Sequence, residues 1–250
     1  MYFCKTGEIL INPGDDPRQI VDFMLYINYS KEFCFAMSFD PAFIADLMGA
    51  GFLVMSARFA DQPENPGESR YLLLPKLHLT RSVLFFPDIR ETKTVRRLLK
   101  RYELRFDTDF DRILNRCVEV HGNDWLTPPL LESIRLIRER SLRFTLRHPG
   151  KPVFTGSYLP VRPVSFGVYR DEKLVAGEFG IIAGKVYTSY SGYRDEDSAG
   201  TVQMVLTGNY LQEKGFAFWD LGMPLPYKNR LGAFNVDPPQ FVELFRRSVP

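Results

Sequence analysis

The chain has 250 residues, of which 45% are hydrophobic and 25% are charged. This composition is typical of a folded globular protein with a sizeable core, and it excludes a disordered, collagen-like or coiled-coil chain. The 32 Lys and Arg residues nearly balance the 30 Asp and Glu residues, so the net charge is only +2. An anionic partner would therefore have to bind a local basic patch.

Neither a membrane span nor a metal site is expected. No apolar run approaches the roughly 20 residues that a membrane-spanning helix needs, and the first residues lack the basic lead and apolar stretch of a signal peptide. Cys4, Cys34 and Cys117 are widely spaced and odd in number, which excludes a full disulfide framework and a Cys-x-x-Cys motif. The three His residues have no metal-ligand spacing. We therefore expect a cytoplasmic protein with reduced cysteines and no metal.

Residues 1–80 are expected to form a small mixed α/β domain. Apolar stretches at 33–37 and 52–55 flank a helical pattern that begins after a capping Asp40-Pro41 pair. An apolar run at 71–74 then predicts a strand.

Three amphipathic helices are predicted next, at residues 91–101, 109–120 and 130–140. The first helix carries five basic side chains, which are Lys93, Arg96, Arg97, Lys100 and Arg101. The third has Thr127 as a capping residue and Pro128 in its first turn. Phosphate backbones are the commonest partners of such basic surfaces. The alternative is an ordinary solvated helix face.

The last third of the chain predicts a sheet with one crossover helix. The expected elements are strands at 164–169, 174–182 and 186–190, a helix at 200–213 and a strand at 216–221. A β-β-β-α-β order with helices packed on the sheet is that of an α+β domain of the acetyltransferase-like (GNAT) type. We therefore expect a second domain of this type over residues 81–250.

Asp220 is the strongest candidate for a catalytic group. It lies near the end of an otherwise apolar strand, where a buried carboxylate is costly unless it is paired, hydrogen-bonded or working as a base. The alternative is that Asp220 caps a following turn, and the local sequence does not separate the two interpretations.

Acetyl-coenzyme A is disfavoured as a cofactor. GNAT enzymes cradle its pyrophosphate on a Gly-containing loop at the start of the helix after the meander. Here no Gly falls three residues after Arg194, and the carboxylates of Asp195, Glu196 and Asp197 occupy the stretch that would bind phosphate. We therefore expect no cofactor.

Short matches along the chain carry a family resemblance. They are Arg81-Ser82-Val83-Leu84, Trp125-Leu126-Thr127, Leu174-Val175-Ala176-Gly177, Asp220 and Leu231-Gly232-Ala233. At corresponding places the leucyl/phenylalanyl-tRNA-protein transferase family has Arg-Ala-Val-Leu, Trp-Ile-Thr, Leu-Val-Gly-Gly, the Asp of Ile-Asp-x-Gln, and Leu-Gly-Ala. The chain resembles this family over roughly residues 81–235, and it is identified as a divergent member.

The resemblance implies a GNAT-like domain that uses aminoacyl-tRNA and moves a Leu- or Phe-type amino acid to the N-terminal amine of an acceptor protein. In the family's proposed mechanism the amine attacks the aminoacyl ester, and an Asp, here Asp220, helps to remove the amine proton. The side chains implied at the aminoacyl-adenosine site are those of Trp125, Phe179, Tyr187 and Trp219, for which ordinary core packing is the alternative. The helix at 91–101 would hold the acceptor stem. For Asp220→Asn we expect loss of transfer with an intact fold.

Five positions depart from the family pattern. Gly222 replaces a Gln, and Tyr190 replaces a Glu that contacts a cationic acceptor N-terminus. Tyr227 and Arg230 replace a His and a Ser. Glu178 takes an apolar position in the pocket for the Leu or Phe side chain, where an unpaired carboxylate is costly. Either Glu178 points elsewhere or the transferred amino acid differs.

Three functions remain open at this point. The leading hypothesis is aminoacyl transfer from tRNA to a protein N-terminus. The second keeps the fold but uses another amine acceptor, such as a cell-wall or lipid group. The third is a homologue that binds tRNA or protein without catalysis.

Overall fold

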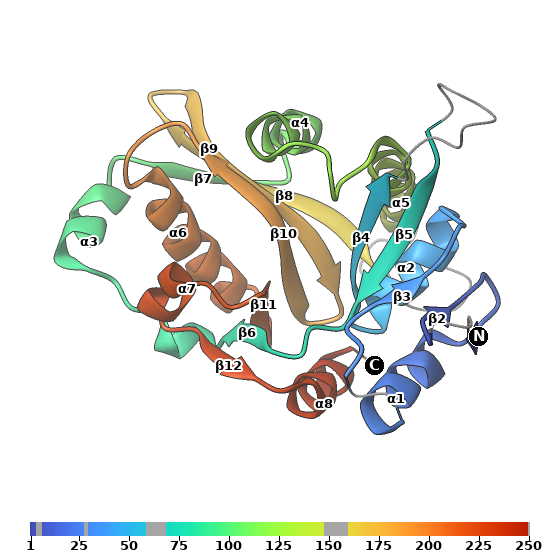
Figure 1. Cartoon of the computed structure of the whole chain (residues 1–250). Coiled ribbons are helices and arrows are strands. Elements are labelled where there is room, and N and C mark those ends of the chain that lie inside the picture. Colours follow the sequence, from blue (N-terminus) through green and yellow to red (C-terminus); the bar gives the residue numbers. More distant parts are fainter. Residues whose placement is uncertain (4–6, 28–29, 59–68, 148–159, 250) are drawn as a thin grey trace. The chain divides into compact units, whose positions relative to one another are not determined.

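The computed structural model describes residues 1–3, 7–27, 30–58, 69–147 and 160–249 of the chain (Figure 1). Its contacts divide the chain into unit 1, Met1–Leu79 with Gly122–Val161, and unit 2, Thr80–His121 with Arg162–Pro250. Residues 122–161, which the sequence placed in the second domain, belong to unit 1. The division into 1–80 and 81–250 stays a prediction.

The described residues of unit 1 form short strands and three helices. Its elements are β1 (Tyr2–Phe3), β2 (Ile9–Leu10), α1 (Pro17–Tyr26), β3 (Cys34–Phe35), α2 (Pro41–Gly49), β4 (Leu53–Arg58), β5 (Tyr71–Lys76) and α5 (Pro128–Arg147). The predicted cap of α2 is confirmed, because the Asp40 carboxylate accepts a hydrogen bond from the Phe43 N–H at 2.9 Å. Thr127 precedes α5, but its hydroxyl pairs with Ser56 Oγ at 2.7 Å.

Unit 2 is built on a seven-stranded sheet. Its elements are β6 (Arg81–Leu84), the 3-10 helix η1 (Phe86–Asp88), α3 (Lys93–Leu99), β7 (Glu103–Phe106), α4 (Phe110–His121), β8 (Arg162–Arg170), β9 (Lys173–Ala183), β10 (Val186–Arg194), α6 (Ala199–Glu213), β11 (Phe218–Gly222), α7 (Pro226–Leu231), β12 (Phe234–Val236) and α8 (Pro238–Ser248). The strand order is β12-β6-β11-β10-β9-β8-β7. A large sheet in a mixed α/β chain is therefore confirmed.

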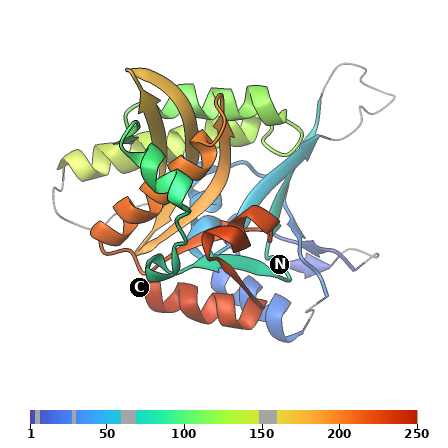
Figure 2. The same cartoon turned by 90° about the vertical axis from the view of Figure 1, so that its left-hand side faces the viewer.

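Helices cover both faces of the sheet (Figures 1 and 2). Ile113 of α4 packs closely on Gly177 of β9, where a Cβ would lie within about 3.0 Å of its side chain. On the opposite face Gly208 of α6 lies against the Trp219 ring. Because successive strand residues point to opposite faces, each strand supplies side chains alternately to the α4 side and to the α6 side.

Strands β10 and β11 run parallel but pair only briefly. Their register joins Val186–Thr188 to residues 218–220, after which β10 continues to Arg194 on β9 alone. The pairing of β10 with β9 shifts between Ser189 and Ser191, which leaves Tyr190 as the extra residue of a β-bulge. The two strands therefore part at Ser189, directly after the pair formed by Thr188 and the predicted catalytic residue Asp220.

Candidate active site

The Asp220 carboxylate lies in a fully buried ion pair with Arg81. Arg81 Nε donates to Oδ1 at 2.7 Å, and a terminal guanidinium nitrogen donates to Oδ2 at 2.6 Å. Thr188 Oγ1 donates to Oδ2 at 2.9 Å, and the Gly222 N–H donates to Oδ1 at 3.0 Å. Four donors thus surround the two oxygens, and the Arg81 guanidinium also lies 4.5 Å from the centre of the Phe241 ring in α8.

This environment changes what the Asp220→Asn substitution is expected to do. An amide would keep one acceptor but would leave the Arg81 guanidinium without its counter-charge inside the protein. Breaking a buried pair in this way typically costs about 3–5 kcal/mol. We therefore expect Asp220→Asn to destabilise the fold markedly, and not to leave it intact as expected from the sequence.

A second buried polar cluster lies on the α6 side of the sheet. Glu178 of β9 is buried, and Ser189 Oγ donates a hydrogen bond to its Oε1 at 2.9 Å. Trp219 Nε1 in turn donates to Ser189 Oγ at 2.8 Å. Gln203 of α6 and Tyr187 of β10 also interact with the Glu178 carboxyl. The Glu178 side chain therefore points inward to polar partners.

Burial raises the pKa of Glu178 to about 7, because loss of hydration outweighs the stabilising effect of the neighbouring Tyr187 and Ser189 hydroxyls. Lys228 of α7 contributes an attractive charge but no direct hydrogen bond to Glu178. Its ammonium instead donates to the carbonyl oxygens of Leu221 and Met223. Burial also lowers the pKa of Lys228 to about 8. Both groups thus titrate near neutral pH.

The predicted aromatic wall is divided between the two faces. Tyr187 and Trp219 are fully buried on the α6 side, with ring centroids 6.0 Å apart. Phe179 is buried on the α4 side, where it lies 6.3 Å from the Phe110 ring and 5.9 Å from the Tyr190 ring. These side chains do not converge on a single surface, and their role in holding an aminoacyl group stays a prediction.

Gly222 and Trp125 have distinct settings. Gly222 has φ +72°, so any larger residue there, including the Gln of the family pattern, would be strained. Trp125 belongs to unit 1, where its carbonyl oxygen accepts hydrogen bonds from the Ser56 backbone N–H and hydroxyl. Its place in an aminoacyl site stays a prediction.

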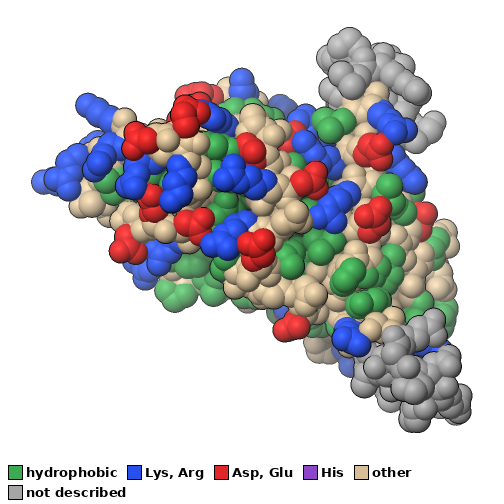
Figure 3. All heavy atoms as spheres, turned by 90° about the horizontal axis from the view of Figure 1, so that it is seen from above, with side chains coloured by type: hydrophobic (Ala, Val, Ile, Leu, Met, Phe, Trp, Pro, Cys, Tyr) green, Lys and Arg blue, Asp and Glu red, His purple; other side chains and the backbone are tan. Residues whose placement is uncertain are grey.

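The five basic residues of the predicted tRNA surface are exposed on and after α3. They are Lys93, Arg96, Arg97, Lys100 and Arg101. Thr92 caps the helix by accepting the Val95 N–H, and Val95 is buried. Lys and Arg side chains gather over this region at the left-hand side of Figure 3. A 3.4 Å ion pair joins the largely exposed Arg96 to Glu91.

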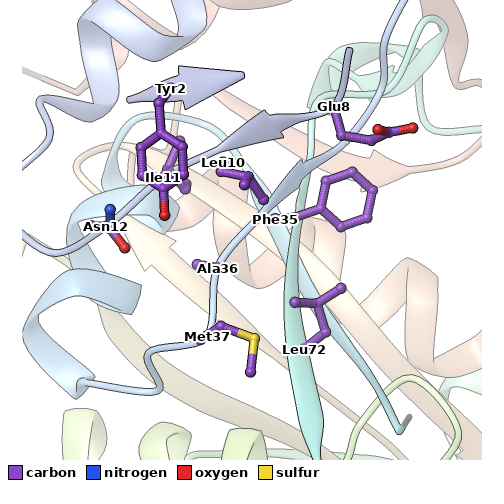
Figure 4. Close-up of a pocket in the computed structure, with 9 residues that line it drawn as sticks. All are labelled: Tyr2, Glu8, Leu10, Ile11, Asn12, Phe35, Ala36, Met37 and Leu72. Carbon is purple, nitrogen blue, oxygen red and sulfur yellow. The ribbon is translucent and has the colours of Figure 1, made fainter. Parts of the chain in front are cut away.

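Two of the pockets formed by described residues lie outside these clusters. A pocket of about 280 Å³ is lined by Lys100 and Arg101 together with Tyr102, Glu103, Tyr169, Asp171 and Glu172. A larger and more apolar pocket of about 400 Å³ lies in unit 1 (Figure 4). It is lined by Tyr2, Glu8, Leu10, Ile11, Asn12, Phe35, Ala36, Met37 and Leu72. Neither pocket is lined by Asp220 or Glu178.

The described part of the chain holds no cluster of three or more His, Cys, Asp or Glu side chains that suits a metal ion. Nor is any helix among the described residues long and apolar enough to cross a membrane. Cys34 and Cys117 are free and buried, and burial raises the pKa of each thiol to about 12. Cys4 lies outside the described residues. The expected absence of a metal stays a prediction.

Several residues of these clusters had no predicted role. Arg81 appeared only as the first residue of a matched motif, and its partner Asp220 is 139 positions away in the sequence. Ser189, Gln203 and Lys228 are common polar residues without a distinctive spacing. Strand alternation is the sequence signal that could have separated the two clusters, because it places Trp219 and Asp220 on opposite faces of the sheet.

Residues 154–246 of the chain match the protein-family model described as leucyl/phenylalanyl-tRNA protein transferase. The protein named leucyl/phenylalanyl-tRNA--protein transferase in Pseudomonas putida (strain W619) is 25% identical over 170 residues, which cover 65% of this chain and 66% of the relative. The protein of that name in Azoarcus sp. (strain BH72) is 26% identical, covering 64% of this chain and 62% of the relative. The chain thus matches just under two thirds of these relatives' length.

Among solved structures, the C-terminal domain (DUF2156) of a proposed lysylphosphatidylglycerol synthetase from Agrobacterium fabrum is 12% identical, with a TM-score of 0.33. That match covers 85% of this chain and 61% of the other. A conserved protein of unknown function from Bacteroides thetaiotaomicron is also 12% identical, with a TM-score of 0.36, covering 88% of this chain and 72% of the other. Scores this low establish no shared fold.

Proposed function

Because the chain is a divergent relative of the leucyl/phenylalanyl-tRNA-protein transferase family, we propose that it is an aminoacyl-tRNA-dependent transferase. It moves a Leu- or Phe-type amino acid from tRNA to the N-terminal amine of an acceptor protein. The observation that carries this proposal is the match of residues 154–246 to the family, since those residues include five of the seven strands of the sheet that holds Asp220 and Glu178, all except β6 and β7.

The proposed fold of unit 2 is acetyltransferase-like. Its support is the antiparallel meander β8-β9-β10, followed by the crossover helix α6 and the parallel strand β11. In this arrangement β10 and β11 stop pairing after Thr188 and Asp220. We propose that the aminoacyl end of the tRNA binds where the two strands part.

The basic surface of α3 supplies the tRNA contact in this proposal. Five exposed cations lie within nine residues, with Glu91 as the acidic partner of Arg96. Each phosphate that they neutralise releases counterions and adds to the affinity. We expect the variant Arg97→Glu, Lys100→Glu to bind tRNA more weakly and to reduce the slope of log affinity against log salt by roughly 0.7–0.9 for each lost phosphate contact.

Filter binding or fluorescence anisotropy at several salt concentrations measures that slope. Lys185→Glu serves as the matched control, because Lys185 is exposed in the β9–β10 turn, away from α3 in the sequence. An equal loss of affinity in the control and in the α3 variant would contradict the assignment of this surface.

Asp220 has a positioning role in the proposed site. Its carboxylate ties Thr188 of β10 to Gly222 at the end of β11 and holds Arg81 of β6. These bonds fix three strands next to the point where β10 and β11 part. Direct proton acceptance by Asp220 would require one of its four donors to leave, so the geometry favours positioning over the base role predicted from the sequence.

The experiment that tests the function uses tRNA charged with radiolabelled Leu or Phe and a peptide library that varies the N-terminal residue. Transfer of label to a peptide amine supports the proposal. Transfer only to a non-peptide amine would select the second hypothesis. Salt-dependent tRNA binding without transfer to any acceptor would contradict catalysis and leave a binding protein.

A further inference from the structure

Glu178 is a buried ionisable group to which the proposed function assigns no role. It lies on β9 between two residues of the opposite face, and its side chain enters the space between the sheet and α6. A Cβ at Gly180 would lie within 2.6 Å of the Tyr187 hydroxyl. The absence of a side chain at Gly180 therefore makes room for the Tyr187 hydroxyl, which is buried and has no hydrogen-bond partner among the described residues.

The hydrogen bonds around Ser189 fix the direction of its proton. The Trp219 indole N–H is a donor only, so at the 2.8 Å contact the Ser189 oxygen accepts. The single hydroxyl hydrogen of Ser189 then points to Glu178 Oε1, 2.9 Å away. One lone pair of the hydroxyl oxygen remains available, which is the arrangement that a proton relay requires.

Ser189 lies where this relay meets the proposed substrate path. It is the first residue of β10 beyond the last one paired with β11, and it is half-buried, whereas Glu178 is buried. On the proposed substrate path, the half-buried Ser189 hydroxyl is therefore more accessible than the buried Glu178 carboxyl.

The groups that act on Glu178 come from four elements. On the α6 side of the sheet they are Tyr187 and Ser189 on β10, Gln203 on α6, and Lys228 and Tyr227 on α7, while Cys117 of α4 acts on Glu178 only at a distance from the other face. Lys228 is the only cation among these groups, and its ammonium donates hydrogen bonds to backbone carbonyl oxygens. Glu178 thus lacks the bidentate Arg partner that Asp220 has, which keeps its carboxylate available for a proton.

We propose that Glu178 is the proton acceptor of the transfer reaction and that it acts through the Ser189 hydroxyl. This inference rests on the proposed transferase function. The acceptor amine attacks the ester carbonyl carbon, and the new C–N bond leaves an N–H proton to be removed. That proton passes to Ser189 Oγ while the hydroxyl proton of Ser189 passes to Glu178. As the C–O bond to the ribose breaks, the proton returns along the same path to the ribose oxygen, giving an amide and a free hydroxyl.

Single-turnover transfer from charged tRNA to an acceptor peptide, measured from pH 5.5 to 8, tests the relay. The acceptor amine itself titrates near pH 8, so the informative quantity is the ratio of the wild-type rate to the Glu178→Gln rate. We expect this ratio to rise about tenfold per pH unit below pH 7 and to level off above it, reaching on the order of 10²–10⁴. Glu213→Gln, at the exposed end of α6, is the matched control with a ratio near one.

Two Ser189 variants separate a relay from a structural role. Ser189→Ala lacks the hydroxyl and should lose the same pH-dependent component, whereas Ser189→Thr keeps a hydroxyl and should restore the rate to within a few-fold. Thermal melts verify that each variant is folded. A ratio for Glu178→Gln that does not change with pH, or full activity in Ser189→Ala, would overturn the relay while the transferase function stands. Absence of transfer by the wild-type protein would instead overturn the function itself.

Discussion

Unit 2 buries two carboxylates on opposite faces of one sheet, and their surroundings differ sharply. Asp220 is bound by the Arg81 guanidinium, a hydroxyl and a backbone N–H, so each oxygen has two donors. Glu178 is bound by Ser189 and neighbouring polar side chains, with Lys228 as a more remote charge. The same degree of burial thus produces a paired charge in one case and an acid with a pKa of about 7 in the other.

The contrast between Asp220 and Glu178 shows that burial alone does not identify a proton-transfer group. A carboxylate with a bidentate partner is stabilised in its charged form and is held in place by that partner. A buried carboxylate with only neutral donors is destabilised in its charged form by the loss of hydration. Its pKa is therefore raised toward the neutral pH at which a proton acceptor must gain and lose a proton. On these grounds Asp220 holds the strands and Glu178 accepts the proton.

The largest expected effect is the destabilisation caused by Asp220→Asn. This change should lower the free energy of unfolding by about 3–5 kcal/mol, because Arg81 is left as an uncompensated buried charge. Arg81→Met should have a similar effect, and the double variant should lose much less than the sum of the two. Chemical denaturation of the three variants at one pH measures the coupling.

The control for this cycle is the exposed ion pair between Arg116 and Asp195, whose atoms lie 2.8 Å apart. Asp195→Asn should change stability by no more than about 1 kcal/mol, as is usual for surface pairs. If Asp220→Asn were as mild as Asp195→Asn, the structural role of Asp220 would be wrong, and a catalytic role for it would regain weight.

A smaller effect is expected from the pH dependence of stability at Glu178. The folded pKa of about 7 lies above the ordinary value of 4.5, so the folded state holds this proton more tightly than the unfolded state. The stabilisation is complete below pH 4.5 and is lost as the pH rises through 7. Relative to Glu178→Gln, the wild-type protein should therefore lose roughly 2–3 kcal/mol between pH 5 and pH 8.

Urea denaturation of both proteins across this pH range measures the loss. The comparison ends at pH 8 because Lys228 begins to titrate there. The pKa of Lys228 is lowered to about 8 in the folded state, so stability increases as the pH rises from 8 toward the unfolded value of 10.5, which opposes the loss caused by Glu178. A difference between the two proteins that stays constant from pH 5 to pH 8 would show that Glu178 does not titrate in this range.

Much of the architecture of unit 2 is predictable from local pattern. The meander, the crossover helix and the strand that carries Asp220 follow from apolar periodicity and turn residues, and the structure gives them as β8, β9, β10, α6 and β11. The strand β7 and the helix α8 were not predicted. The edge strand Glu103–Phe106 alternates charged and apolar residues too briefly to stand out, and α8 begins at a Pro-Pro pair that also fits a turn.

The site was less predictable because its contacts are long-range. Asp220 is conspicuous as an acid in an apolar strand, but nothing in the sequence reveals that Arg81, the first residue of a different strand, is its partner. Glu178 was noticed only as an unusual residue in a family position. Its hydrogen bond with Ser189 joins two strands next to the β-bulge at Tyr190, a backbone irregularity that the sequence pattern does not specify.

An NMR titration of the carboxyl carbons, in protein labelled at Glu Cδ, would test the proposed difference between Asp220 and Glu178 at the residue itself. We expect one Glu resonance, missing in Glu178→Gln, that titrates with a midpoint near pH 7. If that resonance instead titrates between pH 4 and pH 5, like an exposed Glu, Glu178 does not have the environment required of the proton acceptor and the distinction between the two buried carboxylates fails.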